Sequence, residues 1–248
     1  MRLVAIVQAR VASTRLPAKI LLDLGGRTAL EHCLGRARRI RGVDEVVVAT
    51  SNTPADDVIA RVASRLGYPV ARGSEHDVLS RYVIAARRAD ADYVIRLTSD
   101  CPLLDPDVSF VVAQGFLRTQ GTADALDYAS NVASRRLPRG LDTEIMTRAA
   151  LERADRGAEG EAEREHVTLR IYGRPAEFRV AEFLPAGSFS LGHHRWTLDT
   201  LDDYLFLSRL FEQLGDRADS ATMTDVLSVV EGDPELATLN AHVRQKAV

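Results

Sequence analysis

Short, almost entirely apolar segments alternate through the first half of the chain with longer segments in which apolar residues recur every three or four positions. The apolar segments lie at 3–7, 45–49, 70–71 and 92–97. The periodic segments lie at 27–39, 56–66, 77–89 and 106–117. Apolar runs rich in β-branched residues are typical of strands buried on both faces, and the periodic segments predict amphipathic helices. The alternation therefore predicts an α/β fold with a doubly wound, mostly parallel sheet.

The second half of the chain is less regular, and its expected elements are shorter. Strands are expected at 126–129, 141–146, 178–183 and 195–198. Helices are expected at 148–156, 161–172, 201–214, 223–231 and 234–243. No internal repeat interrupts this order, so we expect a single domain over 1–248, with a small lobe of about 124–192 inserted in it.

Composition and charge narrow the class of protein. The chain has 248 residues, 46% of them hydrophobic, which is enough for a sizeable core. Its formal net charge of −3 does not provide the basic surface that nucleic-acid binding needs. No segment approaches the roughly 18 apolar residues of a membrane span, and the apolar start is too short for a signal peptide. Because Cys33 and Cys101 also lack any zinc or CxxC spacing, we expect a reduced, cytoplasmic protein that binds neither nucleic acid nor membrane.

The loop after the first strand carries three cations and two hydroxyl groups. They are Arg10, Ser13, Thr14, Arg15 and Lys19. Doubly wound sheets bind ligands at the carboxyl ends of their strands, where such groups can neutralise a triphosphate. The loop has neither Walker A nor dinucleotide-binding glycine spacing. A phosphate site and a solvated, Arg-rich loop are equally consistent with these residues alone, although Lys19 stands out because the chain's only other lysine is Lys246.

Two further loops supply acidic residues. Asp100 follows the fourth predicted strand, where a carboxylate could bind a divalent metal, whereas Asp105 precedes a proline and suits a helix N-cap. Farther along, Thr200 suits an N-cap and the two acids after it suit the positive end of a helix. That leaves Asp199, at the end of a predicted strand, without a structural role. We expect Asp100 and Asp199 to share a Mg²⁺ ion.

Residues 7–19, Val-Gln-Ala-Arg-Val-Ala-Ser-Thr-Arg-Leu-Pro-Ala-Lys, resemble the N-terminal signature of the nucleotide-sugar cytidylyltransferases. The resemblance is strongest to the branch with the 3-deoxy-manno-octulosonate and spore-coat-polysaccharide-type enzymes, and weaker to the acylneuraminate cytidylyltransferases. It continues, in the family's order, at 72–82, 96–104, 140–144, 164–168 and 196–203. It implies a nucleotide-diphospho-sugar-transferase-like, Rossmann-like fold.

The same resemblance implies transfer of CMP from CTP to a small anionic acceptor, with release of pyrophosphate and Mg²⁺ as cofactor. It also implies a homodimer, with the lobe at 124–192 serving acceptor binding and dimerisation. The residues implied for CTP are Gln8, Ala9, Arg10, Ser13, Arg15, Lys19, Arg72, Ser74, Asp77 and Arg81. The catalytic residues implied are Arg10, Lys19, Asp100 and Asp199, the two aspartates being the metal ligands. The acceptor pocket implied contains Arg139, Gly140, Asp142, Glu144, Glu165 and His166.

Several of these residues have a structural alternative. Asp77 is as well suited to cap the helix that follows it. Glu165 and His166 are equally consistent with a solvated or core-satisfied pair on a helix. His193 and His194 are adjacent in a predicted strand and would point to opposite faces, which argues against a shared metal.

The identity of the acceptor is left open. Asp142 and Glu144 alternate on a predicted strand, so their side chains would share a face of the sheet. There they would repel an acidic acceptor unless the arginines at 135, 136 or 139 offset their negative charge. A ulosonic acid, another sugar and a small phosphonate are all consistent with the residues. Alternatives to the reaction itself are the use of another nucleoside triphosphate and a non-catalytic nucleotide-binding relative. A glycosyltransferase is disfavoured, because the loop after the fourth strand lacks Asp-x-Asp.

Overall fold

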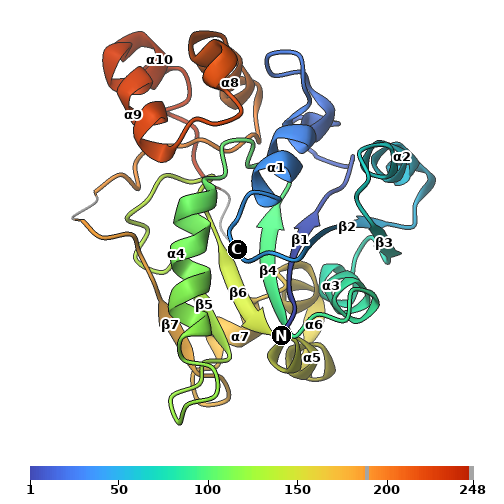
Figure 1. Cartoon of the computed structure of the whole chain (residues 1–248). Helices are drawn as coiled ribbons and strands as arrows, with labels where there is room; N and C mark the ends of the chain where they lie inside the picture. Colours follow the sequence, from blue (N-terminus) through green and yellow to red (C-terminus); the bar gives the residue numbers. More distant parts are fainter. Residues whose placement is uncertain (188–189, 246–248) are drawn as a thin grey trace.

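A seven-stranded sheet forms the centre of the molecule, with its strands in the order β3-β2-β1-β4-β6-β5-β7 (Figure 1). The computed structural model describes residues 1–187 and 190–245. The strands are β1 (Leu3–Gln8), β2 (Glu45–Ser51), β3 (Val70–Gly73), β4 (Tyr93–Thr98), β5 (Tyr128–Ser130), β6 (Glu144–Thr147) and β7 (Val180–Glu182). The α-helices are α1 (Ala29–Ala37), α2 (Asp57–Arg65), α3 (Val78–Arg88), α4 (Pro106–Leu117), α5 (Arg148–Gly157), α6 (Gly160–Glu165), α7 (Leu169–Gly173), α8 (Leu201–Leu214), α9 (Met223–Gly232) and α10 (Pro234–Thr238).

The strand order places the loops after β1 and β4 side by side. β1 pairs in parallel with β2 on one side and with β4 on the other, and β2 pairs in parallel with β3. The chain therefore builds the sheet outward from β1 in one direction and then from β4 in the other, which opens a crevice at the carboxyl ends of these two strands. β6 runs antiparallel to both of its neighbours, β4 and β5. The predicted doubly wound, mostly parallel sheet is confirmed.

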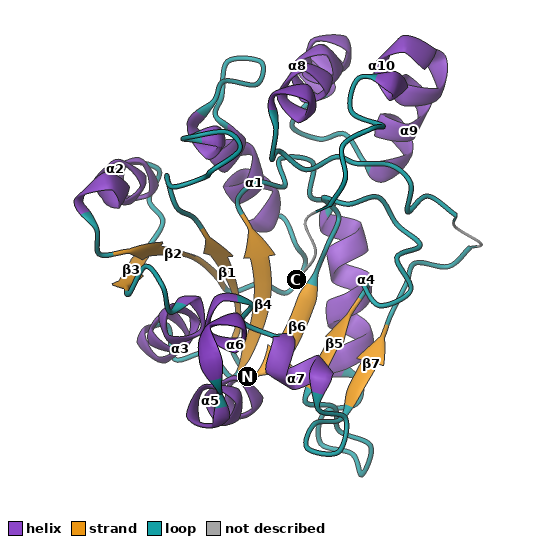
Figure 2. Cartoon of the chain, turned by 180° about the vertical axis from the view of Figure 1, so that it is seen from behind, coloured by secondary structure: helices purple, strands orange, loops and turns teal. Residues whose placement is uncertain are grey.

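The apolar residues of β1 serve both faces of the sheet. Leu3, Ala5 and Val7 belong to a core shared with α1, α2 and α4, while Val4 and Ile6 belong to a second core shared with α3, α5 and α7. This double burial is why β1 is a continuous apolar run. A third core lies among α8, α9 and α10, which Figure 2 shows grouped beyond the carboxyl ends of the strands. Within 1–187 and 190–245, no helix combines the length and the apolar content needed to cross a bilayer.

The elements predicted for the first half all exist, with ends within two residues of those predicted. Several predictions for the second half are wrong. The segment 195–198 is not a strand, because among the described residues only Arg139 of a neighbouring loop bridges to it, at Arg195. The helix predicted over 161–172 is divided into α6 and α7, because the backbone leaves the helical conformation at His166.

The segment 124–192 contributes β5, β6 and β7 to the central sheet. Its proposed roles in acceptor binding and dimerisation stay predictions. β6 begins at Glu144, so Asp142 precedes the strand, and the prediction that these two acids alternate on one strand is wrong. The last predicted helix is also shorter than expected, since α10 ends at Thr238.

A buried ion pair joins β6 to β4. Arg96 and Glu144 lie opposite each other in the antiparallel register, and the guanidinium donates to one carboxylate oxygen. The Tyr128 and Thr168 hydroxyls donate to the other oxygen, each at 2.6 Å. Burial alone would raise the pKa of Glu144, but Arg96 and the two hydroxyls outweigh it and hold that pKa below its usual value. Glu144, which the resemblance implies for the acceptor pocket, thus already has partners for both oxygens inside the sheet.

Replacing Glu144 by Gln is expected to lower the free energy of unfolding by about 3 kcal/mol at neutral pH, because the buried Arg96 loses its counter-charge. Since folding lowers the pKa of Glu144, its carboxylate contributes stability above pH 4.5, and this contribution is lost as the pH falls through the folded-state pKa. Urea unfolding should therefore show the gap between wild type and variant shrinking in acid. The control is Glu152→Gln, which breaks an exposed pair with Arg87 and should change little. Equal effects in the two variants would contradict a structural role for Glu144.

Candidate active site

Three side chains from distant parts of the chain meet at the carboxyl ends of β1 and β4. The ammonium of Lys19 lies 2.6 Å from Asp100 Oδ2 and 2.6 Å from Asp199 Oδ1. The side chains of Lys19 and Asp199 are 12% and 13% exposed, and that of Asp100 is 25% exposed. The cluster is therefore screened from bulk solvent and still reachable. The structure brings together the lysine and both aspartates of the predicted catalytic set.

Hydrogen bonds hold the loop of Asp100 against the segment that carries Asp199. The Asp100 carbonyl accepts from the Leu198 N–H at 2.8 Å and from the Thr197 hydroxyl at 3.1 Å. These contacts bring the segment before α8 to the end of β4, although the two are about a hundred residues apart in sequence. The position of Asp199 therefore depends on the backbone at Asp100.

The loop after β1 is held by Asp56, a residue that sequence reasoning placed only at the start of a helix. Asp56 Oδ1 accepts from the Val11 N–H at 2.7 Å, and Oδ2 accepts from the N–H and the hydroxyl of Ser51 at the end of β2. Within the loop, the Ser13 hydroxyl accepts from the Leu16 N–H. The only sign of this role in the sequence is an acidic residue that follows a predicted strand. An acid in that place is equally typical of a helix N-terminus.

Two arginines hold the second oxygen of Asp199. Its Oδ2 lies 3.0 Å from Arg15 Nη2 and 2.7 Å from Arg195 Nη2. Arg195 also pairs with Asp203, which is fully buried and completes a capping box with Thr200. The predicted N-cap is thus confirmed. Sequence reasoning missed Arg195, because the segment around it is typical of a strand and no local pattern points to its partners.

Opposite charges set the protonation of the cluster. Burial by itself would lower the pKa of Lys19, but Asp100 and Asp199 outweigh it and raise the pKa above its usual value. Burial would raise the pKa of Asp199, but Lys19 and the two arginines lower it below its usual value. At neutral pH the cluster therefore holds an ammonium and an ionised Asp199. Burial and the neighbouring Asp100 raise the pKa of the Cys101 thiol.

Gln8, at the end of β1, is oriented by the Arg96 guanidinium, which donates to its Oε1 at 3.3 Å. The Tyr82 hydroxyl also lies 3.3 Å from this oxygen, but its single proton lies closer to the Leu97 carbonyl, at 3.0 Å. The next residue, Ala9, is buried and donates its N–H to the Ala49 carbonyl. The amide N–H groups of Gln8 are thus the part of this side chain that is left to donate to a ligand.

The segment 72–81, which the resemblance implies for the nucleoside, is built around a buried arginine. Arg81 Nη1 donates to the Ser74 and Glu75 carbonyls at 2.6 and 3.0 Å. Arg72 instead turns toward α2, where its Nη1 lies 2.7 Å from Asp57 Oδ1. Arg81 therefore shapes this loop by holding its backbone carbonyls.

Two ion pairs join the end of α6 to the loop after β1 and to the N-terminus of α3. Arg164 lies 3.4 Å from Asp77, and the exposed Glu165 lies 3.4 Å from Arg10. Asp77 also accepts the Ser80 N–H at 2.9 Å, so its alternative role as the N-cap of α3 is confirmed. The structure thus places Glu165 beside Arg10, a residue implied for the phosphates, while His166 follows as the C-cap of α6.

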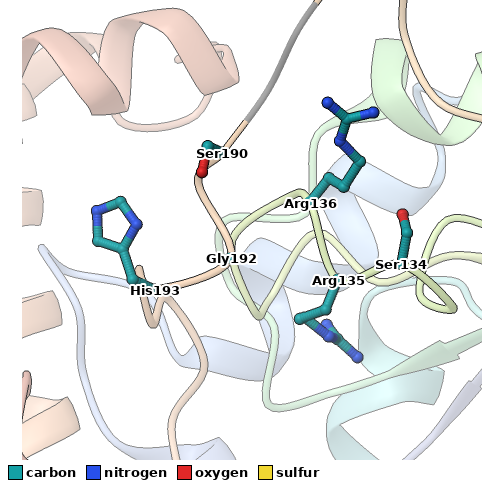
Figure 3. A pocket seen from close by; sticks show the side chains of 6 residues that line it. All are labelled: Ser134, Arg135, Arg136, Ser190, Gly192 and His193. Carbon is teal, nitrogen blue, oxygen red and sulfur yellow. The ribbon is translucent and has the colours of Figure 1, made fainter.

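A pocket of about 400 Å³ lies between two loops of the predicted acceptor region. It is lined by Ser134, Arg135, Arg136, Ser190, Gly192 and His193 (Figure 3). The Leu191 N–H donates to the Arg136 carbonyl, and a Cβ at Gly192 would come within 1.9 Å of the Arg135 carbonyl oxygen, so only glycine fits there. Arg135 and Arg136 extend in opposite directions from their loop, and Arg135 pairs with Asp142 at 2.6 Å.

Arg139 and Gly140 pack directly against the segment that follows this pocket. The Arg139 carbonyl accepts from the Trp196 N–H at 2.7 Å. Gly140 has a φ of 109°, and a Cβ there would lie 2.6 Å from the Trp196 carbonyl oxygen. The rings of His193 and His194 lie 4.1 Å apart, so the prediction that they point to opposite faces of a strand is wrong. Both residues lie in a loop.

A family profile described as cytidylyltransferase matches residues 4–214. The chain belongs to the cytidylyltransferase family. It is 34% identical to the spore coat polysaccharide biosynthesis protein SpsF of Bacillus subtilis, over 94% of this chain and 95% of that protein. It is 33% identical to a 3-deoxy-manno-octulosonate cytidylyltransferase of Anaeromyxobacter dehalogenans, over 70% of this chain and 73% of that one. A cytidylyltransferase structure from Leptospira borgpetersenii matches with a TM-score of 0.88 and 31% identity, covering 100% of this chain and 99% of that one.

The donor set of this cytidylyltransferase fits a Mg²⁺ ion whose other ligands come from a substrate. Among the described residues, no group of three or more His, Cys, Asp and Glu side chains is arranged to hold a metal. Asp100 and Asp199 nevertheless converge on one cation, because a single ammonium lies 2.6 Å from both. Mg²⁺ in nucleotide enzymes is commonly bound by one or two carboxylates together with phosphates and water.

Replacing Arg195 by Gln is expected to lower the free energy of unfolding by about 3 kcal/mol, because the buried Asp203 loses its cation. The same change should slow cytidylyl transfer, since Asp199 loses one of the groups that orient it. Chemical denaturation measures the first effect, and pyrophosphate release measures the second. Arg209→Gln, on the exposed side of α8, removes a pair with Asp233 and should alter neither quantity. If Arg195→Gln behaved like this control, Arg195 would not be the support of Asp199.

Proposed function

We propose that this protein transfers CMP from CTP to a small acidic acceptor, an acid sugar or a phosphonate, and releases pyrophosphate with the help of Mg²⁺. The meeting of Lys19, Asp100 and Asp199 at the carboxyl ends of β1 and β4 is the observation that supports this most directly. A cation and two carboxylates at this edge of the sheet are what a metal-bound triphosphate needs. Membership of the cytidylyltransferase family supports CTP as the nucleotide.

The cations of the loop after β1 would bind the triphosphate. Arg10 pairs with the exposed Glu165, and Arg15 reaches Asp199 from the edge of the cluster. Exposed ion pairs are weak, so Arg10 can exchange Glu165 for a phosphate at little cost. Together with Lys19, these guanidinium groups would stabilise the charge that develops on the departing pyrophosphate.

The reaction would be an in-line displacement. An acceptor oxygen attacks the α-phosphorus of CTP while the bond to pyrophosphate breaks. Mg²⁺ held by Asp100 and Asp199 would lower the pKa of an acceptor hydroxyl and neutralise the α-phosphate. The protein's own contribution is positioning and charge stabilisation. A covalent intermediate is not expected on either cysteine, because both are buried and burial raises the pKa of Cys33 to about 12.

Gln8 is the candidate reader of the base. Its carbonyl oxygen is engaged by Arg96, so its amide presents N–H donors. Cytosine offers acceptors at O2 and N3, whereas N3 of uracil carries a hydrogen. A donor directed at N3 would therefore favour cytosine over uracil, because at that position of uracil it would meet a second donor and stay unpaired.

The arginine-lined pocket of Figure 3 suits the anionic group of the acceptor. Arg135 and Arg136 line it, and Arg139 lies in the same loop. Asp142 is offset by its pair with Arg135, which reduces the repulsion that this acid would exert on an acidic substrate. Planar, bidentate guanidinium groups match carboxylates and phosphonates, so such acceptors are favoured over neutral sugars.

The test is pyrophosphate release from CTP and Mg²⁺ against a panel of acid sugars, neutral sugars and small phosphonates. We expect turnover with one of the acids, and little when UTP, GTP or ATP replaces CTP. Asp100→Asn should slow the reaction by about a hundredfold or more, because a carboxylate that binds the metal is lost. Asp216→Asn is the matched control, since Asp216 is exposed in the 3₁₀ helix Gly215–Arg217.

The outcomes separate the parts of the proposal. Turnover with a neutral sugar alone would contradict the acidic acceptor and leave the nucleotide site intact. Turnover with another nucleotide in preference to CTP would contradict the reading of the base by Gln8. If calorimetry detected no binding of CTP with Mg²⁺, the central proposal would be wrong.

A further inference from the structure

The Lys19 ammonium occupies the point on which the two candidate metal ligands converge. It lies 2.6 Å from one oxygen of Asp100 and 2.6 Å from one oxygen of Asp199. Mg²⁺ binds oxygen ligands at about 2.0–2.1 Å and surrounds itself with a near-octahedral shell. An ion shared by the same two oxygens would therefore fall against the lysine nitrogen. One position cannot hold both cations.

We propose that Lys19 is the resident counter-ion of Asp100 and Asp199, that a divalent ion displaces it, and that the displaced ammonium then binds the phosphates of the nucleotide. This inference rests on the proposed function in one respect, because it takes Asp100 and Asp199 as the metal ligands.

The two carboxylates keep their places without the lysine. The loop of Asp100 is held through its backbone carbonyl, which accepts from the Leu198 N–H. Asp199 uses its other oxygen, Oδ2, to bind Arg195. Arg195 in turn is anchored on the fully buried Asp203. Only the oxygens that face Lys19 have to exchange one cation for another.

Lys19 is the member of the cluster that can leave. Its ammonium is a compact charge on a flexible four-carbon stem, while Arg195 is buried and held at both Asp199 and Asp203. The exchange leaves no group unpaired, because the carboxylates gain a divalent ion and the ammonium gains a triphosphate. Metal and nucleotide should therefore strengthen each other's binding, with Lys19 as part of the coupling.

The first measurement is the binding of Mn²⁺ to the nucleotide-free protein, followed by electron paramagnetic resonance. Lys19→Met should bind Mn²⁺ about tenfold more tightly than the wild type or better, because a positive charge no longer opposes the ion. Arg217→Met removes a cation from an exposed residue of the 3₁₀ helix Gly215–Arg217 and should leave the affinity unchanged. Adding Asp100→Asn to Lys19→Met should abolish the gain.

The second measurement uses the wild-type protein, so that it does not depend on how well a variant folds. Selective ¹³C labelling of lysine gives two side-chain signals, since the chain has only Lys19 and Lys246. Added Mg²⁺ should shift the Lys19 signal in a saturable way. Lys19→Met assigns the signals.

Two results would overturn the exchange. One is equal affinity of the wild type and Lys19→Met for Mn²⁺; the other is a Lys19 signal that stays in place while Mg²⁺ saturates the wild type. Absence of Mn²⁺ binding to every variant, even with CTP present, would overturn both the exchange and the metal role in the proposed function. A normal exchange without pyrophosphate release on any acceptor would overturn the proposed function alone.

Discussion

Two carboxylates that face each other across the end of a sheet repel unless a cation lies between them. In this protein the two carboxylates belong to Asp100 and Asp199. These residues lie 81 and 180 positions along the sequence from Lys19, the lysine that joins them. The strand order brings the loops after β1 and β4 together, and the Asp100 carbonyl then holds the segment of Asp199 against β4. The fold of the chain thus serves to hold a concentrated negative charge beside a loop of cations, which is the arrangement a metal-bound triphosphate completes.

A second charge pair connects the segment 124–192 to the same crevice. Arg96 of β4 donates to Glu144 of β6 and also to Gln8 at the end of β1. The Tyr82 hydroxyl of α3 lies 3.3 Å from the same amide oxygen, so α3 and β4 meet at Gln8, and β6 reaches it through Arg96. The buried pair therefore helps to order Gln8, and the antiparallel strand β6 supports the crevice as well as the sheet.

The sequence predicts well what depends on neighbours along the chain. The alternation of strands and helices in the first half, the N-caps Asp105 and Thr200, and the acids at strand ends all follow from local patterns. It fails where a side chain takes its role from partners far away. Arg195 has Asp203 and Asn240 as partners. In the sequence these three residues belong to one predicted strand and two predicted helices, and nothing in their spacing predicts that they meet.

The second half shows the same limit in its backbone. The segment 195–198 has the alternation of a strand, but a strand needs a neighbour along its length, and here only Arg139 bridges to it. The loop conformation in turn lets His193 and His194 lie with their rings 4.1 Å apart, which adjacent residues of a strand do not do. Trp196 and Leu198 are buried as the alternation predicts, but Arg195 and Thr197 are buried too, and the hydrogen bonds that would define a strand do not form.

Lysine at position 19 is informative in a chain that otherwise uses arginine. Of the 32 basic residues only Lys19 and Lys246 are lysine. A guanidinium presents its donors on separate nitrogens of a rigid plane, as Arg195 does when it binds Asp199 through Nη2 and Asp203 through Nε. An ammonium is a nearly spherical charge with three donors, and it can lie at the same 2.6 Å from both. Its compact charge therefore resembles that of the metal ion that those two carboxylates would bind. It is carried on a flexible side chain that can turn away when the ion binds.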